Sequence, residues 1–264
     1  MKLGAQLYTV RQFTKTPEDI EKTLRKIKAM GFDVIQISGF GPMDPHKLGD
    51  LIHELELDVC ITHNSYERLT NDLDNLIEEH RLMGCDAIGI GSMPNQFRGS
   101  KEGAQAFIKE FNEIAKKIAD AGMKFGYHNH DFEFERFDGR LVMDMLLEDT
   151  VPEFGFILDT YWLQAGGVSP EDYIRRASPR MKVCHFKDMK IVQNDTLPRK
   201  IGPTFTEVGT GNLNLAACMK ACIESGVSHI VIEQDICEID PFESLGISYV
   251  NLKKLAADAG ALEA

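Results

Sequence analysis

The sequence predicts an α/β fold, a (β/α)8 barrel that forms a single domain over residues 1–264. First, eight short apolar runs recur along the chain, and each is followed by a stretch with helical periodicity. Second, these runs are almost continuously apolar, which is typical of parallel strands that are buried on both faces. Third, a chain of 264 residues without a linker or low-complexity stretch matches one such barrel in length.

The apolar runs give the predicted strands in chain order. They cover residues 3–10, 34–38, 57–63, 87–91, 124–128, 154–159, 182–186 and 229–233. A doubly wound open sheet is the alternative fold, but no G-x-G-x-x-G sequence follows the first strand to support a dinucleotide site. The sequence GTGNL at 209–213 precedes a helical pattern without following a strand, so it indicates a turn and a helix cap. The barrel is therefore the preferred prediction.

Helix starts and ends are marked between the strands. Thr16 is a candidate N-cap because Pro17 follows it at the first helical position. The same signal recurs as Asp-Pro at 44–45 and as Ser-Pro at 169–170, and Ser100 begins the longest predicted helix. The glycines that we expect to end helices are Gly31, Gly84, Gly122, Gly226 and Gly260.

Composition limits the class of protein. A hydrophobic fraction of 43% is enough for a full core, and a net charge of −12 argues against a nucleic-acid partner, which requires a basic surface. The six cysteines show no disulfide or zinc-site spacing, so we expect reduced, buried thiols. The N-terminus lacks the pattern of a secretory signal and no apolar run reaches 18 residues, which predicts a cytoplasmic protein without a membrane partner.

Candidate metal ligands end four of the predicted strands. Asp159, His185 and Glu233 each close an apolar run, and the fifth run is followed by both His128 and Glu133. Because a barrel places its chemistry at the carboxyl ends of the strands, these side chains are expected to converge on one rim. Carboxylates and histidines together suit a divalent cation. We prefer Glu133 as the ligand from the fifth strand, with His128 as the alternative.

Each of these residues also has a plainer interpretation. Asp159 is a possible N-cap for the next helix, and His185 is a possible core histidine, although strand alternation turns it toward the barrel axis if Cys184 faces the helices. Lys187, two residues after His185, is a candidate for stabilising an enolate oxygen or for moving a proton, and its alternative is a solvated loop lysine.

Further residues near the predicted rim are candidates for binding substrate. They are His63, His128, His130, Trp162 and Lys187. The aromatic faces of His63 and Trp162 suit the C–H surface of a sugar. The segment 189–210 has no clear periodicity and contains Asn194, Pro198 and Gly202. A loop of this length at the catalytic rim suggests a lid, and a structural excursion or an oligomer contact is the alternative.

The motifs resemble a known family. LGAQLYTVR, YHNHDFEF, LDT, HFKD, VGTGNL and VIEQD, in this order, resemble the xylose isomerase-like TIM-barrel superfamily and its sugar phosphate isomerase/epimerase branch. The resemblance covers essentially the whole chain. It implies one divalent metal ion, most often Mn2+ with Mg2+, Co2+ or Zn2+ as alternatives, and a possible homo-oligomer. The ligands that it implies are Glu133, Asp159, His185 and Glu233.

Two positions depart from the commoner pattern of that family. The YHNH…E sequence resembles a branch with inosose dehydratases and enzymes that act on 3-keto sugars. Gln36 stands where many relatives carry an acidic residue. The superfamily also includes apurinic endonucleases with a three-zinc cluster. That cluster needs many more histidine and acidic ligands, and DNA binding needs a basic groove, whereas this chain has eight histidines and a net charge of −12.

The function that the resemblance implies is a metal-dependent sugar isomerase or epimerase of carbohydrate metabolism. It would abstract a proton next to a carbonyl through a metal-stabilised enediolate, with Glu133 and Glu233 exchanging the proton and Lys187 assisting. The alternative is a metal-dependent dehydratase or lyase on an inosose, a 3-keto sugar or a glycoside. A barrel that binds a sugar without catalysis is the third hypothesis.

Overall fold

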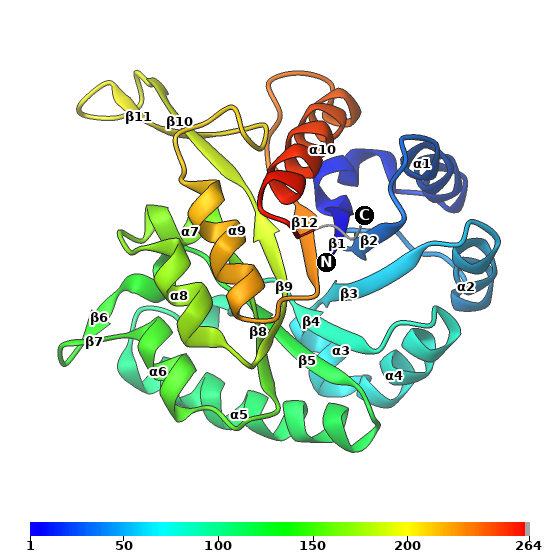
Figure 1. Cartoon of the computed structure of the whole chain (residues 1–264). Coiled ribbons are helices and arrows are strands. Elements are labelled where there is room, and N and C mark those ends of the chain that lie inside the picture. Colours follow the sequence, from blue (N-terminus) through cyan, green and yellow to red (C-terminus); the bar gives the residue numbers. More distant parts are fainter. Residues whose placement is uncertain (262–264) are drawn as a thin grey trace.

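The computed structural model describes residues 1–261 and shows a closed barrel of eight parallel strands surrounded by helices (Figure 1). Around the barrel, the strands follow the order β1-β12-β9-β8-β5-β4-β3-β2. Their bounds are β1 (Lys2–Gln6), β2 (Val34–Ile37), β3 (Asp58–Asn64), β4 (Ala87–Ile90), β5 (Lys124–His128), β8 (Phe154–Asp159), β9 (Met181–Phe186) and β12 (His229–Ile232). The predicted α/β barrel is confirmed.

The helices lie outside the barrel and begin where the sequence predicts caps. Thr16 accepts a hydrogen bond from the backbone N–H of Asp19, and the longest helix follows Ser100. The helices are α1 (Pro17–Ala29), α2 (Pro45–Glu54), α3 (Tyr66–Asn71), α4 (Leu73–Leu82), α5 (Lys101–Asp120), α6 (Val142–Asp149), α7 (Thr160–Ala165), α8 (Pro170–Ala177), α9 (Leu215–Glu224) and α10 (Pro241–Asp258).

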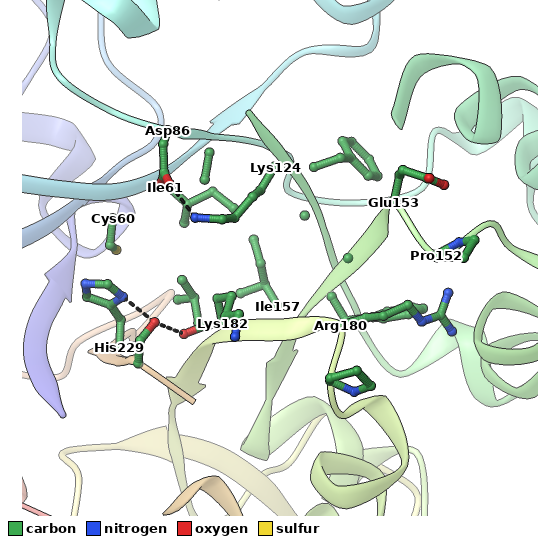
Figure 2. Close-up of a pocket in the computed structure, with 18 residues that line it drawn as sticks. Cys60, Ile61, Asp86, Lys124, Pro152, Glu153, Ile157, Arg180, Lys182 and His229 are labelled. Carbon is green, nitrogen blue, oxygen red and sulfur yellow. Dashed lines mark hydrogen bonds and ion pairs between the residues drawn. The ribbon is translucent and has the colours of Figure 1, made fainter. Parts of the chain in front are cut away.

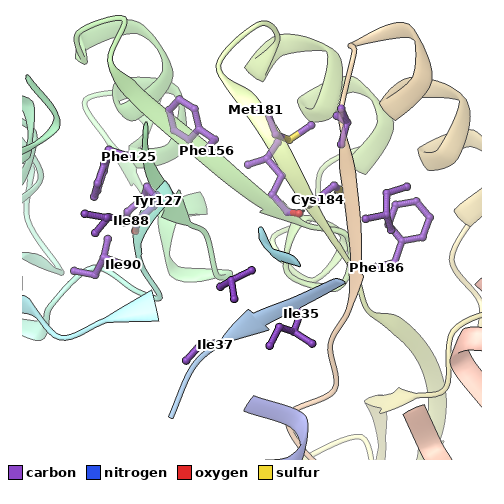
Figure 3. Packing of buried hydrophobic residues seen from close by; sticks show 14 of the residues in the cluster. Ile35, Ile37, Ile88, Ile90, Phe125, Tyr127, Phe156, Met181, Cys184 and Phe186 are labelled. Atoms are coloured by element: carbon purple, nitrogen blue, oxygen red, sulfur yellow. Dashed lines mark hydrogen bonds between the residues drawn. The ribbon is translucent and has the colours of Figure 1, made fainter. Parts of the chain in front are cut away.

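Strand alternation divides the core into two layers. Side chains that point away from the barrel axis pack against the helices, as Figure 3 shows for Ile88, Ile90 and Cys184. The inward layer is smaller and consists of Val34, Cys60, Ile61, Ala87, Ile157, Val183 and Val231. Because side chains alternate along a strand, the inward positions that follow this layer carry the polar residues of the upper rim.

The first strand is shorter than the sequence predicts. It ends at Gln6, and residues Leu7–Phe13 form a 3-10 helix (η1) instead of continuing the strand. The Gln6 side chain accepts a hydrogen bond from the N–H of Tyr8, which caps this helix and turns the chain across the rim. An apolar run does not distinguish a strand from a buried turn of helix, which explains the difference.

The segment 189–210, which has no clear periodicity in the sequence, forms regular structure over most of its length. It contains an antiparallel hairpin of β10 (Asp188–Gln193) and β11 (Ile201–Thr206), which extends away from the barrel (Figure 1). The buried carboxylate of Asp188 accepts backbone N–H bonds from Gly209, Gly211 and Leu213, so it fixes the GTGNL turn. A second short hairpin joins β6 (Arg136–Phe137) and β7 (Arg140–Leu141), after the 3-10 helix η3 (Phe132–Phe134). The remaining 3-10 helix of the described residues, η2 (Asn95–Phe97), lies between β4 and α5.

The composition also predicted the state of the cysteines and the lack of a membrane-spanning segment. All six cysteines are free thiols, and five of them are buried. Within residues 1–261, no helix combines the length and the apolar character that crossing a membrane requires.

Candidate metal centre

Four side chains converge at the carboxyl end of the barrel. His128 from β5, Asp159 from β8, His185 from β9 and Glu233, directly after β12, each offer one ligand atom, and these atoms lie within 4.8 Å of one another. All four residues are buried. The strands are neighbours in the barrel, so their ends bring together residues that are up to 105 positions apart in the sequence (128 to 233).

Hydrogen bonding fixes which nitrogen of His128 carries the proton. Its Nδ1 atom lies 3.0 Å from the carbonyl oxygen of Gly91 and donates to it, because a carbonyl oxygen can only accept. The Nε2 atom therefore holds a lone pair in the neutral ring. This atom faces Asp159 Oδ2 and Glu233 Oε2, each at 3.5 Å, and has no hydrogen-bond partner in the described chain. A lone pair that faces two carboxylates is unfavourable unless a proton or a cation lies between them.

The ring of His185 meets an oxygen on each side. Its Nδ1 atom is 2.8 Å from Glu233 Oε2, and its Nε2 atom is 2.8 Å from Gln36 Oε1. Burial lowers the pKa of His185 more than Glu233 raises it, so the ring is neutral and carries one proton. One ring proton can satisfy only one of these two oxygens. If it lies on Nε2 and is donated to Gln36, the Nδ1 lone pair is free to bind a metal.

The two carboxylate oxygens of Asp159 have different surroundings. Its Oδ1 atom accepts hydrogen bonds from the backbone N–H groups of Tyr161 and Trp162, at 2.8 and 3.1 Å, and so caps α7. Its Oδ2 atom is buried without a hydrogen-bond partner among residues 1–261, and it points to the other three side chains. Asn129 accepts the backbone N–H of Asp159 and links the ends of β5 and β8. One carboxylate oxygen therefore orients the side chain while the other is available.

The donor set fits a divalent cation. Two imidazole nitrogens and two carboxylate oxygens are a ligand combination that Zn2+, Mn2+, Co2+ and Fe2+ accept. The unpaired Nε2 of His128 and Oδ2 of Asp159 are atoms that such an ion would satisfy. In the protein alone, burial lowers the pKa of His128, but contacts with the two carboxylates outweigh this and raise it to about 10. A proton thus takes the place of the ion.

Glu133, the preferred ligand from the sequence, lies outside this group of four. It belongs to η3, and both of its carboxylate oxygens have partners. Oε1 accepts the hydroxyl proton of Tyr127, and Oε2 accepts the backbone N–H of His130 at 2.8 Å. Burial raises the pKa of Glu133 to about 7. The residue of the fifth strand that lies close to Asp159, His185 and Glu233 is therefore His128, which was the alternative in the sequence prediction.

Lys187 is fully buried beside the four side chains. Its Nζ atom lies 2.6 Å from Asp235 Oδ2, 3.2 Å from Glu233 Oε2 and 3.3 Å from Asp159 Oδ2. Burial alone would lower the pKa of Lys187, but the three carboxylates outweigh it and raise the pKa. Lys187 is therefore an ammonium group, which suits it to stabilise negative charge on oxygen rather than to act as a base.

A cavity of about 510 Å³ opens beside two of the four side chains, His128 and Glu233. His63, His128, His130, Glu233 and Asp235 are among its lining residues. Burial lowers the pKa of His130 to about 2 and that of His63 well below its ordinary value, so both rings are neutral.

Trp162 lies next to this cavity. Its ring is 5.1 Å from that of His130, and the Lys187 ammonium is 5.1 Å from its centre. Of the side chains predicted to bind substrate, His63, His128 and His130 line the cavity, whereas Trp162 and Lys187 lie behind its wall, beside His130 and the four side chains.

Three polar residues of the site have no counterpart in the sequence prediction of ligands and catalytic groups. Gln6 and Gln36 are fully buried at the ends of β1 and β2, and Asp235 follows Glu233 by two residues. The signal for the glutamines was a neutral amide inside an apolar strand, where a polar side chain requires a partner. The signal for Asp235 was a second acidic residue just past the end of β12.

A second cavity, of about 460 Å³, lies at the opposite end of the barrel and is shown in Figure 2. Ile61, Ile157 and Val183 of the inward layer form part of its wall, with Lys124, Arg180 and Lys182 near the amino ends of their strands. None of the candidate site residues lines it. The inward apolar layer therefore separates this cavity from the metal centre.

Comparisons with known proteins agree with this architecture. Residues 17–241 match the family described as xylose isomerase-like TIM barrel. A sugar phosphate isomerase/epimerase from Parabacteroides distasonis is 21% identical, with a TM-score of 0.77 over 96% of this chain and 93% of that chain. No curated protein matches the sequence.

Two further structures share the fold at lower identity. An L-ribulose 3-epimerase is 17% identical, with a TM-score of 0.72 over 100% of this chain and 99% of that chain. A probable 3-DHS dehydratase from Bacillus anthracis is 14% identical, with a TM-score of 0.72 over 96% and 99%. At these identities the likeness shows the fold, whereas the family match covers most of the sequence. The chain belongs to the xylose isomerase-like TIM-barrel family.

Proposed function

We propose that this protein is a divalent-metal-dependent isomerase or epimerase of a ketose or a related sugar. The observation that carries the proposal is the convergence of His128, Asp159, His185 and Glu233, two of which, His128 and Glu233, line a 510 Å³ cavity. We propose these four as the ligands, with His128 in the place for which the sequence favoured Glu133. A bound divalent cation supplies positive charge beside the substrate carbonyl and lowers the free energy of the enediolate.

The acid–base groups come from the residues that line the cavity. Glu233 takes the proton from the carbon next to the carbonyl, and its carboxylate is held by the Lys187 ammonium. Asp235, hydrogen-bonded to Lys187, is the second acid–base group that epimerisation requires. Glu133 has both oxygens engaged, so in this proposal it positions the loop that carries His130.

The remaining side chains bind and shield the substrate. Lys187 stabilises the oxyanion that forms when the proton leaves, because its ammonium is buried next to the metal ligands. His130 and Trp162 supply the aromatic face for a sugar ring. The names of the structural neighbours, which include an L-ribulose 3-epimerase, support a small sugar as the substrate.

The test is exchange of solvent deuterium into sugars. The protein is loaded with Mn2+ and incubated in D2O with a panel of ketoses that includes L-ribulose, and the products are followed by NMR. Incorporation at the carbon next to the carbonyl, absent in Glu233→Gln, supports the proposal. An unsaturated product from an inosose or a 3-keto sugar would select the dehydratase instead. No exchange with any sugar would contradict proton abstraction.

A further inference from the structure

His63 holds a fixed position at the edge of the cavity. It lies near the end of β3, with its ring centre 5.2 Å from that of His128 and 5.7 Å from that of His185. Its Nδ1 atom faces the Gln6 side chain, and a Cβ atom added at Gly91 would lie 2.9 Å from the same nitrogen. The ring therefore packs between the Gln6 side chain and the backbone at Gly91, where a side chain larger than that of glycine would meet it.

The Gln6 amide can take only one orientation here. Its Oε1 atom accepts the backbone N–H of Tyr8 at 3.1 Å, so its Nε2 atom faces His63 Nδ1 at 3.3 Å. An amide nitrogen donates and does not accept, so His63 Nδ1 must be the acceptor. The single proton of the neutral ring is then on Nε2. The backbone at the first turn of η1 in this way determines the tautomer of a histidine on another strand.

The Nε2–H group of His63 has no partner in the protein. The atom is buried without a hydrogen bond to any of residues 1–261, and the ring lines the cavity above the metal centre. A buried donor without a partner is unfavourable, and functional sites are where such groups are found. A protonated ring nitrogen has no lone pair for a cation, so this group fits an oxygen acceptor, either a carbonyl or a hydroxyl.

We propose that His63 is a neutral hydrogen-bond donor to a sugar oxygen, and that Gln6 is the positioning residue that keeps its proton on Nε2. The identity of the acceptor as a sugar oxygen rests on the function proposed above, whereas the tautomer does not. Gln36 acts on His185 with the opposite polarity, through its carbonyl oxygen. Gln6 and Gln36, on adjacent strands, thus act in opposite ways. The amide nitrogen of Gln6 makes His63 a donor to substrate, and the amide oxygen of Gln36 makes His185 a metal ligand.

The tautomer is tested directly by NMR of protein labelled with 15N-histidine and loaded with Zn2+. In the wild type, the His63 signals, identified by their loss in His63→Gln, should show the proton on Nε2 and none on Nδ1. In Gln6→Glu, the carboxylate attracts a proton to Nδ1. His80, whose Nδ1 donates to the Leu76 carbonyl, is the internal reference and should not change. A proton on Nδ1 of wild-type His63, or no change in Gln6→Glu, would overturn the proposal.

The donor role is tested with xylitol as a probe. Its binding should shift the His63 Nε2–H signal, and Gln6→Glu should bind xylitol roughly tenfold more weakly while its Zn2+ content stays unchanged. Bound xylitol that leaves this signal in place would overturn the donor role. If no ketose exchanges deuterium but the tautomer and the shift are as expected, the proposed reaction fails and this inference stands.

Discussion

The Nε2 atom of His128 lies 3.5 Å from the Oδ2 atom of Asp159, and neither atom has a hydrogen-bond partner in the described part of the chain. Both atoms are buried, on strands that are neighbours in the barrel. Because the Gly91 carbonyl holds the His128 proton on Nδ1, the two facing atoms are both electron-pair donors in the neutral state. This arrangement is unfavourable alone and favourable around a cation, and the predictions on metal binding depend on it.

Replacing His128 should remove the metal, whereas replacing Glu133 should not. His128→Gln eliminates one of the four ligand atoms, so we expect it to weaken metal binding by more than the roughly 10–100-fold that is typical for the loss of an outer hydrogen-bond partner. Glu133→Gln is the matched variant, because it also exchanges a buried group for an amide five residues away. Metal analysis of both purified proteins measures the difference. If Glu133→Gln loses the metal and His128→Gln keeps it, Glu133 is the ligand instead of His128.

Metal uptake should release a proton at neutral pH. The pKa of His128 is raised to about 10 in the protein alone because the two carboxylates outweigh the effect of burial, so the ring is protonated below that pH. The metal requires the neutral ring, which means that affinity rises about tenfold per pH unit below 10. Calorimetry of Zn2+ binding in buffers of different ionisation enthalpy counts the protons. If no proton is released at pH 7, His128 does not lose its proton to the metal, and this prediction is wrong.

Gln36 should strengthen metal binding without touching the ion. When a metal takes the Nδ1 lone pair of His185, the single ring proton is on Nε2, and the Oε1 atom of Gln36 lies 2.8 Å away to accept it. We expect Gln36→Leu to lower the metal affinity by roughly 10–100-fold. Gln36→Glu is the control, because it keeps an oxygen acceptor at the same place and should retain the metal. Equal loss in both variants would indicate a packing effect instead.

Glu133 should make the protein less stable as pH rises. Its pKa is raised by burial from 4.5 to about 7 in the folded state, so the folded protein binds this proton more tightly than the unfolded chain. The contribution to stability is complete below pH 4.5 and is lost as pH rises through about 7, for a total of about 3 kcal/mol.

Urea unfolding from pH 4.5 to 8 measures this slope in the wild type and in Glu133→Gln, which cannot ionise. The variant should lose most of the slope over that range. A slope that is the same in both proteins would show that Glu133 titrates normally in the fold.

The sequence was sufficient for the strands that carry Asp159, His185 and Glu233. Each residue ends an apolar run, and a carboxylate or imidazole in that position is rare without a partner. The rule that barrel sites form at the carboxyl ends of the strands then places all three on one rim. Local pattern and fold class together were therefore enough to predict that these three side chains meet.

The choice between His128 and Glu133 required tertiary structure. It depends on the hydrogen bond from Tyr127 to Glu133 and on the 3-10 turn at Phe132–Phe134, which together hold the Glu133 carboxylate outside the group of four. Neither feature has a periodic signal in the sequence. Gln6 was not identified for a similar reason, since its role depends on the backbone of η1, where the apolar run predicted a continuous strand.

The most direct measurement is an anomalous difference map from crystals grown with Mn2+. The central claim predicts a single strong peak with His128, Asp159, His185 and Glu233 each contributing one atom, at distances near the 2.0–2.2 Å that are typical of nitrogen and oxygen ligands, or about 0.1 Å longer. A peak bound by Glu133 in place of His128 would contradict the ligand assignment. The absence of any peak at the carboxyl end of the barrel would contradict the metal centre itself.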